Sequence, residues 1–176
     1  PLNLFGSPFT QIVTVNRLAS LTTNDGAIAM SQIKFKIVDY RDYSADIQTV
    51  RRSVFHLEQG VDPTLDFDGK DETADHILAY VENQPVGTVR VRYLDHQTAK
   101  IERLAVLSDF RGQGIGKTLM EESLEVAAQN QVKRVIIHAQ DYVKSLYLNL
   151  GFLPEGELFE EAGIAHLKMI KLLKSL

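Results

Sequence analysis

The sequence predicts a single α+β domain built on a mixed sheet. Three strand patterns follow one another between residues 77 and 107, at the short spacing that is typical of an antiparallel meander. A helical pattern then separates the last of them, 98–107, from an apolar run at 132–139, and such a crossover makes the two flanking strands parallel. The chain of 176 residues is long enough for one domain with its own core.

The first elements alternate between strand and helix. Residues 33–39 alternate apolar and polar side chains as a strand does, and residues 42–57 carry apolar side chains at helical spacing. Residues 59–73 read as a loop, because a proline, a glycine and many aspartates suit neither regular structure. Strands 77–82 and 86–93 follow, around an Asn-Gln-Pro turn.

The second half of the chain contains the crossover and a short closing region. Apolar side chains from residue 115 onward mark one face of a helix, and the near-continuous apolar run 132–139 is typical of a strand buried on both faces. Residues 142–150 predict a short helix that ends at Gly151, where a left-handed cap is favoured. Two more strands are expected around residues 152–159 and 164–172.

Composition and charge argue against several classes of protein. A net charge of -4 and a pI near 5.7 argue against nucleic acid as the main partner. The absence of cysteine excludes disulfides, thiolate metal sites and a cysteine nucleophile. It is also compatible with a reducing cytoplasm, where we expect the protein to act. No run of apolar residues reaches the length of a membrane span, and no metal is expected.

Residues 1–29 differ from the rest of the chain, with one base, Arg17, and one acid, Asp25. They contain no compact apolar segment of the kind found in a signal peptide. We expect residues 1–29 to be an upstream extension, with a natural start at Met30 and the functional domain at 30–176. The alternative is a genuine N-terminal arm that packs on the domain or on a partner subunit.

A glycine-rich segment joins the third strand of the meander to the following helix. Glycines let the backbone approach a ligand, and the unpaired first amides of a helix at the positive end of its dipole favour phosphate. We therefore predict a phosphate-bearing cofactor at this turn. The predicted binding residues are Arg111, Gly112, Gln113, Gly114, Ile115, Gly116, Lys117 and Thr118.

Two familiar phosphate motifs do not match this segment. A Walker A loop needs a glycine five residues before the glycine of Gly-Lys-Thr, where Arg111 stands. A dinucleotide fingerprint that starts at Gly112 needs its third glycine where Lys117 stands. Magnesium-dependent binding of ATP or GTP is therefore the weaker interpretation.

The pattern that fits is Arg-x-x-Gly-x-Gly, formed by Arg111, Gly114 and Gly116. With a second signature about thirty residues later, the chain resembles the GNAT superfamily of acyl-CoA-dependent N-acyltransferases. That second signature consists of Tyr147, Gly151 and Phe152. The resemblance spans roughly residues 33–171 and narrows to the ElaA-like branch of the family. The narrower likeness rests on Ala139-Gln140, Leu146-Tyr147, Gly151-Phe152, residues 160–166, residues 51–55 and Glu58-Gln59.

The resemblance implies a fold with helices on both faces of the sheet, and acetyl-CoA as co-substrate. In this family the parallel strands splay apart and the pantetheine arm lies in the gap. The backbone of Leu104, Ala105 and Val106 is then expected to pair with pantetheine, and one amide polarises the thioester carbonyl as an oxyanion donor.

Tyr147 is the predicted acid, because a phenol can protonate the departing CoA thiolate. Glu102, on the central strand, is the first candidate for the base that deprotonates the amine. Its alternatives are His76, His138, His166, His56 and Glu58. For Arg103 the sequence leaves open a structural ion pair or a place in the wall of the substrate pocket. The aspartates of residues 62–75 are interpreted as a solvated loop, or as a field that attracts a cationic amine.

These observations predict an N-acetyltransferase that moves an acetyl group from acetyl-CoA to a primary amine by direct attack in a ternary complex. The acceptor is a small-molecule or peptide amine, and a homodimer is compatible with the resemblance. The alternative is a non-catalytic module that binds acyl-CoA as a ligand or sensor. Only the enzyme predicts thioester loss that an amine stimulates.

Overall fold

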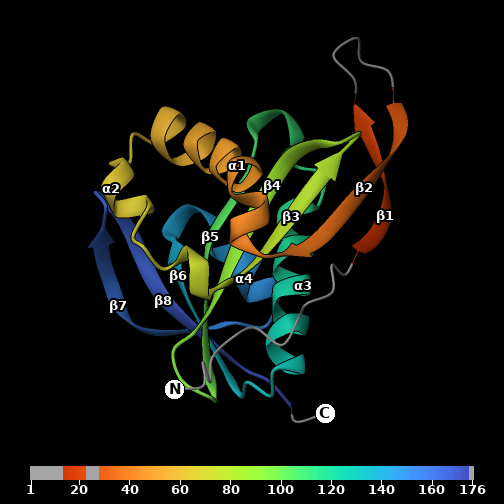
Figure 1. Cartoon of the computed structure of the whole chain (residues 1–176). Helices are drawn as coiled ribbons and strands as arrows, with labels where there is room; N and C mark the ends of the chain where they lie inside the picture. The colour runs from red at the N-terminus through yellow and green to blue at the C-terminus, as the bar shows by residue number, and fades with distance from the viewer. Residues whose placement is uncertain (1–13, 23–27, 175–176) are drawn as a thin grey trace.

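The computed structural model describes residues 14–22 and 28–174. In this part of the chain, eight strands form one sheet in the order β1-β2-β3-β4-β5-β6-β8-β7 (Figure 1). All neighbouring strands in this order are antiparallel except β5 and β6, which are parallel. The strands are β1 Thr14–Thr22, β2 Ile28–Val38, β3 Asp75–Val81, β4 Gln84–Tyr93, β5 Thr98–Val106, β6 Arg134–Gln140, β7 Leu153–Glu161 and β8 Ile164–Leu172.

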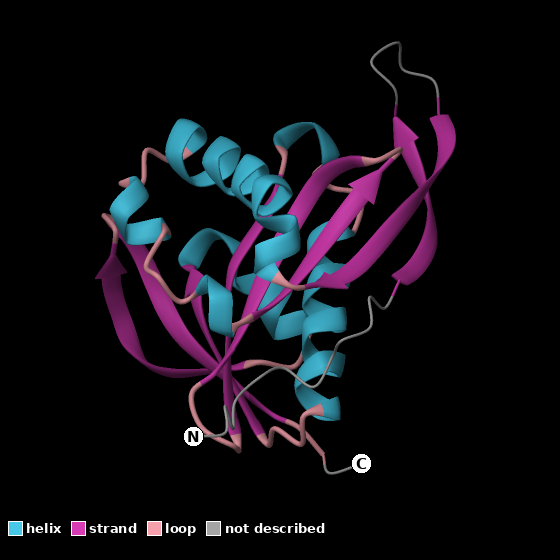
Figure 2. Ribbon diagram, viewed as in Figure 1, coloured by secondary structure: helices cyan, strands magenta, loops and turns pink. Residues whose placement is uncertain are grey.

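Helices cover both faces of the sheet (Figure 2). On one face, Ile47 of α1 packs against Leu78 and Tyr80 of β3. On the other, α3 packs over Ile77 and Ala79, the alternate residues of the same strand. The helices are α1 Tyr40–Arg51, which continues as a π-helical segment over Arg52–Glu58, α2 Pro63–Asp66, α3 Ile115–Gln129 and α4 Lys144–Asn149. Short 3₁₀ turns cover Asp71–Thr73, Ser108–Phe110 and Asp141–Val143.

Gly87 on β4 lets α3 approach the sheet closely. A Cβ at this position would lie 3.0 Å from Leu119 Cδ1 and 3.2 Å from Ile115 Cγ2, both on the buried face of α3. Any larger residue would therefore push the helix away from the strand. The start of α3 is fixed in this way beside β4 and β5, and the glycine-rich turn before it is fixed with it.

The parallel pair separates after three residue pairs, the last of which joins Lys100 to Ile136. Beyond that point β5 stays paired with β4 alone, and its other edge has no partner strand among the described residues. The register of β4 and β5 shifts between Thr88 and Arg90, where β5 has one residue more than β4. This bulge contains Arg103, which has a φ of 59°. This bulge bends β5 away from β6, so the splay implied by the resemblance is present.

Most predicted elements are confirmed within a few residues at their ends, but two expectations fail locally. The segment 59–73 is not only a loop, because it contains α2 and the 3₁₀ turn Asp71–Thr73. No local pattern predicted β1, which pairs along its whole length with β2. The boundary expected at residue 30 thus falls inside β2, and a natural start at Met30 stays a prediction.

Candidate active site

A cavity of about 600 Å³ opens where β5 and β6 separate. Its walls come from residues 100–106 of β5, from β6 and from the last turn of the helical segment that ends at Glu58. The glycine-rich turn closes one end, and the turn between β7 and β8 closes the other. One continuous space therefore joins the predicted phosphate site to the predicted catalytic residues.

The unpaired edge of β5 presents backbone groups to this cavity. Leu107 N–H donates to Val86 O at 2.9 Å and so faces β4. Because successive residues of a strand face opposite sides, the backbone groups of Val106 and Leu104 face the open edge. Arg111 Nε donates to Val106 O at 2.9 Å, which agrees with this orientation. Ala105 is buried, and its side chain contributes to the wall.

The glycine-rich turn has the geometry of an anion cradle. Gly112 and Gly114 adopt φ values of 74° and 80°, where a side chain would be strained. Thr118 N–H donates to Gly114 O at 3.0 Å, so the amides of residues 115–117 precede the first hydrogen bond of α3. Gly112, Gly114, Ile115, Gly116 and Lys117 line the cavity.

The side chains around this turn have protein partners. Gln113 Nε2 donates to Asp109 O at 3.3 Å, and Lys117 lies 3.7 Å from Glu121. Arg111 forms a bidentate pair with Glu58, and its hydrogen bonds hold the pKa of the Glu58 carboxyl below its usual range. Cofactor contacts by Arg111, Gln113, Lys117 and Thr118 stay predictions.

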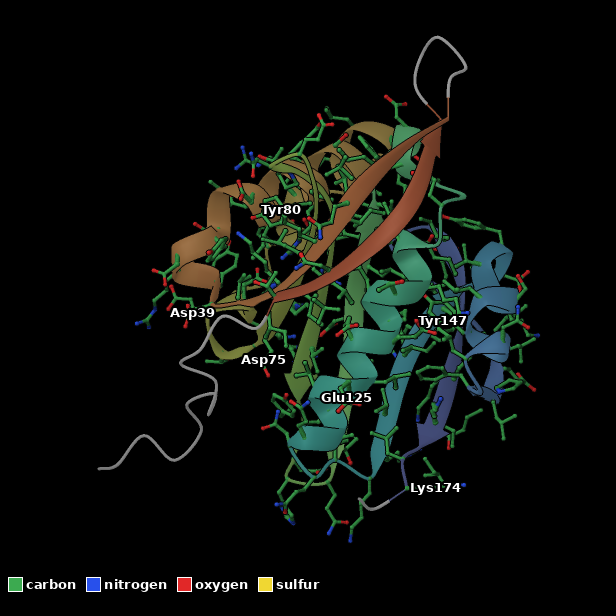
Figure 3. The ribbon with its side chains drawn as sticks, turned by 90° about the vertical axis from the view of Figure 1, so that its right-hand side faces the viewer. Asp39, Asp75, Tyr80, Glu125, Tyr147 and Lys174 are labelled. Carbon is green, nitrogen blue, oxygen red and sulfur yellow. The ribbon has the colours of Figure 1, made fainter. Side chains whose placement is uncertain are left out.

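Tyr147 on α4 lines the cavity on the side of the sheet that α3 and α4 cover (Figure 3). The residue is 7% exposed, and its ring meets Phe152 edge to face at a centroid distance of 6.1 Å. Burial, with a smaller contribution from Tyr142, raises the pKa of Tyr147 to about 12. The phenol is therefore protonated at neutral pH, as a proton donor must be.

Glu102 lies at the cavity in a strongly cationic environment. Its carboxylate hydrogen bonds with Arg92 and lies 3.4 Å from Arg90 and 3.7 Å from Lys100. Burial alone raises the pKa of Glu102, but these cations outweigh it and hold the pKa below its usual range. The group is thus ionised, but it has a low affinity for the proton that a base must accept.

Of the histidines predicted as alternative bases, two line the cavity and two lie outside it. His138 and His166 line the cavity, and His166 Nδ1 bonds to Ile164 O at 2.8 Å. His56 Nε2 instead bonds to Asp66 at 3.0 Å. His76 is 1% exposed, bonds to Asp71 O at 3.0 Å, and has its pKa lowered to about 4 by burial.

Two residues that sequence reasoning missed join this site. Lys100 and Glu161 line the cavity beside His138. For Lys100, the alternation of strand 98–107 was an available signal, because it places Lys100 on the face of Glu102. Glu161 lies in the segment 160–166 that carries the likeness to the ElaA-like branch, but that likeness implied no role for it.

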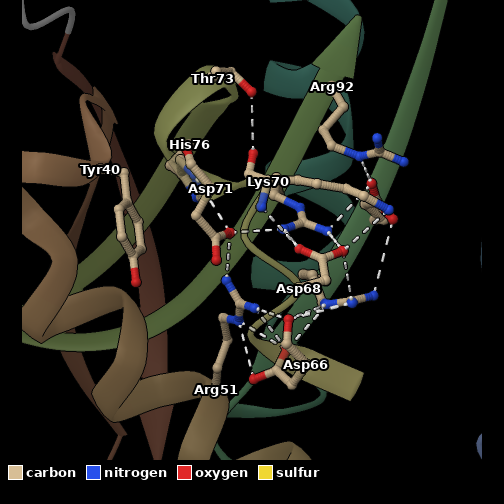
Figure 4. A network of polar contacts seen from close by, with 12 residues as sticks. Tyr40, Arg51, Asp66, Asp68, Lys70, Asp71, Thr73, His76 and Arg92 are labelled. Atoms are coloured by element: carbon tan, nitrogen blue, oxygen red, sulfur yellow. Dashed lines mark hydrogen bonds and ion pairs between the residues drawn. The ribbon is translucent and has the colours of Figure 1, made fainter. Parts of the chain in front are cut away.

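The aspartate-rich segment is an internal ionic cluster, which corrects the view of it as a solvated loop or an attractive field (Figure 4). Asp66 and Asp71 are 2% and 5% exposed. Arg51, itself buried, bonds to Asp66 Oδ1 and to Asp71 Oδ1, both at 2.7 Å. Arg90, also fully buried, bonds to Asp71 at 2.8 Å.

Arg103 connects this cluster to the cavity and combines the two roles that the sequence left open. Its Nε lies 3.0 Å from Asp66 Oδ1, and its Nη2 donates to Leu65 O at 2.8 Å. The same residue lines the cavity at the bulge of β5. The ion pairs therefore fix the segment 62–71 against the strand that carries the site.

The described part of the chain shows neither a metal cluster nor a membrane-spanning helix. Within it, no group of three or more His, Cys, Asp or Glu side chains is arranged to hold a metal ion. Its helices do not include one with the length and apolar character needed to cross a membrane.

Comparison with known sequences gives one consistent result. Residues 44–173 match the family model of the acetyltransferase (GNAT) domain. The Bacillus subtilis protein YyaT is 38% identical over 125 residues, which cover 69% of this chain and 84% of YyaT. Escherichia coli ElaA is 34% identical over 127 residues, which cover 69% of this chain and 82% of ElaA.

Solved structures give the same result. The crystal structure of Escherichia coli ElaA superposes with a TM-score of 0.71 and 28% identity, covering 79% of this chain and 99% of ElaA. A GNAT family acetyltransferase from Elizabethkingia anophelis, solved with acetyl-CoA bound, shares the fold with a TM-score of 0.53 and 23% identity, covering 64% of this chain and 86% of that one. The chain belongs to the GNAT family of N-acetyltransferases and is related to ElaA.

Proposed function

We propose that the protein transfers an acetyl group from acetyl-CoA to a primary amine by direct attack within a ternary complex. The observation that supports this most is the continuous cavity from the start of α3, along the free edge of β5, to Tyr147. A cofactor with a phosphate end and a reactive thioester end fits such a space, and the β7–β8 turn lines the cavity where the acceptor would bind.

The residues present fit acetyl-CoA. The amides of residues 115–117 and the two glycines with positive φ suit the pyrophosphate. The edge groups of Leu104 and Val106 suit the amide-rich pantetheine arm, which would add to β5 as a further strand does. The relative from Elizabethkingia anophelis, whose structure contains acetyl-CoA, supports the same choice.

The chemistry follows from the groups along the cavity. An edge amide of β5 donates to the thioester oxygen, where negative charge develops during attack. Tyr147, protonated at neutral pH, donates its proton to the departing thiolate. Glu102 is the base suggested by the sequence, although its cationic neighbours weaken it in this role.

The alternative is a module that binds acyl-CoA without turnover. Release of free thiol from acetyl-CoA, measured with and without a panel of primary amines, distinguishes the two. The enzyme predicts release that rises and saturates with one amine, together with an acetylated product of matching mass. Binding of acetyl-CoA with no amine-dependent release would leave the sensor as the better account.

Location and assembly stay part of the proposal. The cysteine-free sequence is compatible with the cytoplasm, where we expect the protein to act. A homodimer is compatible with the resemblance, and sedimentation of the purified chain would establish its assembly state.

A further inference from the structure

His138 on β6 makes a short contact with a carboxylate at the acceptor end of the cavity. Its Nδ1 lies 2.7 Å from Glu161 Oε2 on β7. The two residues come from different strands, and both line the cavity. An imidazole with a carboxylate at this distance is the arrangement of a positioned base in many transferases and hydrolases.

The contact with Glu161 determines which ring nitrogen carries the proton. Nδ1 has two neighbours, the Glu161 carboxylate at 2.7 Å, which only accepts hydrogen bonds, and Lys100 Nζ at 3.3 Å, which only donates them. The shorter contact assigns the proton to Nδ1. The hydrogen bond from His138 holds the pKa of the Glu161 carboxyl well below its usual range, so this partner is ionised. Nε2 of the neutral ring then keeps its lone pair, and the described residues offer it no hydrogen-bond partner.

Aromatic packing fixes the plane of the imidazole. Phe159 meets the His138 ring edge to face, with centroids 4.9 Å apart and planes at 77°. Phe159 also stacks on His166, with centroids 6.0 Å apart and planes at 28°. The ring is thus held before any acceptor enters, as a base needs to be.

We propose that His138 is the general base that deprotonates the acceptor amine, and that Glu161 is the residue that positions it. The inference rests on the proposed acetyl transfer. The amine nitrogen forms a bond to the thioester carbon, and His138 Nε2 takes the proton that this nitrogen loses. The C–S bond breaks, the thiolate takes the Tyr147 proton, and both residues recover their protonation states from solvent.

Charged groups around His138 favour it over the other candidates. Lys100 Nζ lies 3.3 Å from Nδ1 and 3.7 Å from Glu102, so its charge is shared with a second carboxylate. Lys168, the register partner of His138 on β8, bonds to Glu155 at 2.7 Å. A carboxylate stabilises the imidazolium that forms during proton transfer. His166 bonds through Nδ1 to the backbone carbonyl of Ile164, and its charge influences Glu161 less than that of His138 does.

Steady-state kinetics test the assignment. Tyramine, spermidine and a tripeptide with a free amino end are compared as acceptors, and the best of the three is used for all variants. We expect His138→Gln to lower kcat by at least about 100-fold, with acetyl-CoA affinity unchanged. The pH dependence of kcat/KM that the wild type shows should be altered in this variant. Glu161→Gln should lower kcat by about tenfold or more, and Glu161→Asp should restore part of the rate. His96→Gln, in an exposed turn, is the matched control.

A spectroscopic measurement needs no acceptor. Nitrogen-15 NMR of the His138 ring should show the Nδ1–H tautomer in the wild type and a mixture in Glu161→Gln. Full turnover by His138→Gln, or loss of the pH dependence in His166→Gln alone, would overturn the assignment. A wild type that binds acetyl-CoA but acetylates no amine would overturn the proposed function, and this inference with it.

Discussion

Arg111 and Glu58 form a two-point ion pair across the cavity, with Nη1–Oε1 and Nη2–Oε2 distances of 2.7 Å each. Arg111 belongs to the glycine-rich turn, and Glu58 ends the helical segment that forms another wall of the cavity. If Arg111 turns toward a cofactor phosphate, this pair must open. The arginine then exchanges the Glu58 carboxylate for a phosphate, and this carboxylate becomes free in the cavity.

Replacing Glu58 should therefore strengthen cofactor binding. An exposed ion pair contributes about 0.2–1 kcal/mol, so Glu58→Gln should lower the Kd for acetyl-CoA by up to about fivefold. Calorimetric titration measures this, with Glu157→Gln on the exposed face of β7 as control. Weaker binding in Glu58→Gln would instead mean that the pair holds Arg111 in its binding position.

Tyr147→Phe tests the predicted acid. The variant keeps the packing against Phe152 but removes the proton donor, so kcat should fall by about 100-fold or more. Affinity for acetyl-CoA should change by less than about twofold, because the phenol acts only when the thiolate leaves. Tyr43→Phe, on α1 and outside the cavity, is the control. Unchanged turnover in Tyr147→Phe would show that Tyr147 is not the general acid.

The buried ionic cluster is expected to matter for stability. Arg51→Leu removes the partner that Asp66 and Asp71 share and leaves each with one other arginine, Arg103 and Arg90. The free energy of unfolding should therefore fall by up to about 3–5 kcal/mol. Arg41→Leu removes a similar but exposed pair with Glu72 and should cost less than about 1 kcal/mol. Urea unfolding of both variants gives the comparison, and equal losses would contradict the importance of burial.

Stability should also decline in mild acid because of His76. Burial lowers its pKa in the folded protein to about 4, from an ordinary value near 6.5. Between these values the unfolded chain binds a proton that the folded protein does not, so stability falls as the pH drops through this window. The contribution approaches about 3 kcal/mol at pH 4, at about 1.4 kcal/mol per pH unit.

Urea unfolding between pH 7 and pH 4 measures this contribution. His76→Gln, which keeps an amide donor for Asp71 O, should show a clearly smaller decline than the wild type, whereas exposed His96→Gln should match the wild type. Parallel curves for all three proteins would exclude His76 as the cause.

Local patterns predicted most of the fold. The meander strands and α3 follow from alternation and helical spacing, because each packs one face on a shared core. The strand β1 was not predicted, because its residues do not alternate clearly between apolar and polar side chains. Its pairing with β2 became visible only in the fold. The glycine-rich turn could be predicted because its backbone needs positive φ angles, and the glycines that adopt them are visible in the sequence.

The interior of the site was much harder to predict. Arg103 meets Asp66 across 37 positions of sequence, and Arg51 meets Asp71 across 20. Aspartates in a polar segment normally indicate exposure, and only the folded chain reveals two buried arginines beneath them. The pairing of His138 with Glu161 depends in the same way on the register of β6, β8 and β7.

The most direct test of the account is calorimetric titration with acetyl-CoA of the wild type, Gly116→Asp and Gly116→Asn. A Cβ at Gly116 would meet Val106 Cγ2 at 3.8 Å, an ordinary contact, so both variants should fold. We predict micromolar binding by the wild type, loss of more than about tenfold in Gly116→Asp because its carboxylate faces the phosphates, and a smaller loss in Gly116→Asn. Absence of acetyl-CoA binding by the folded wild type would contradict the central claim.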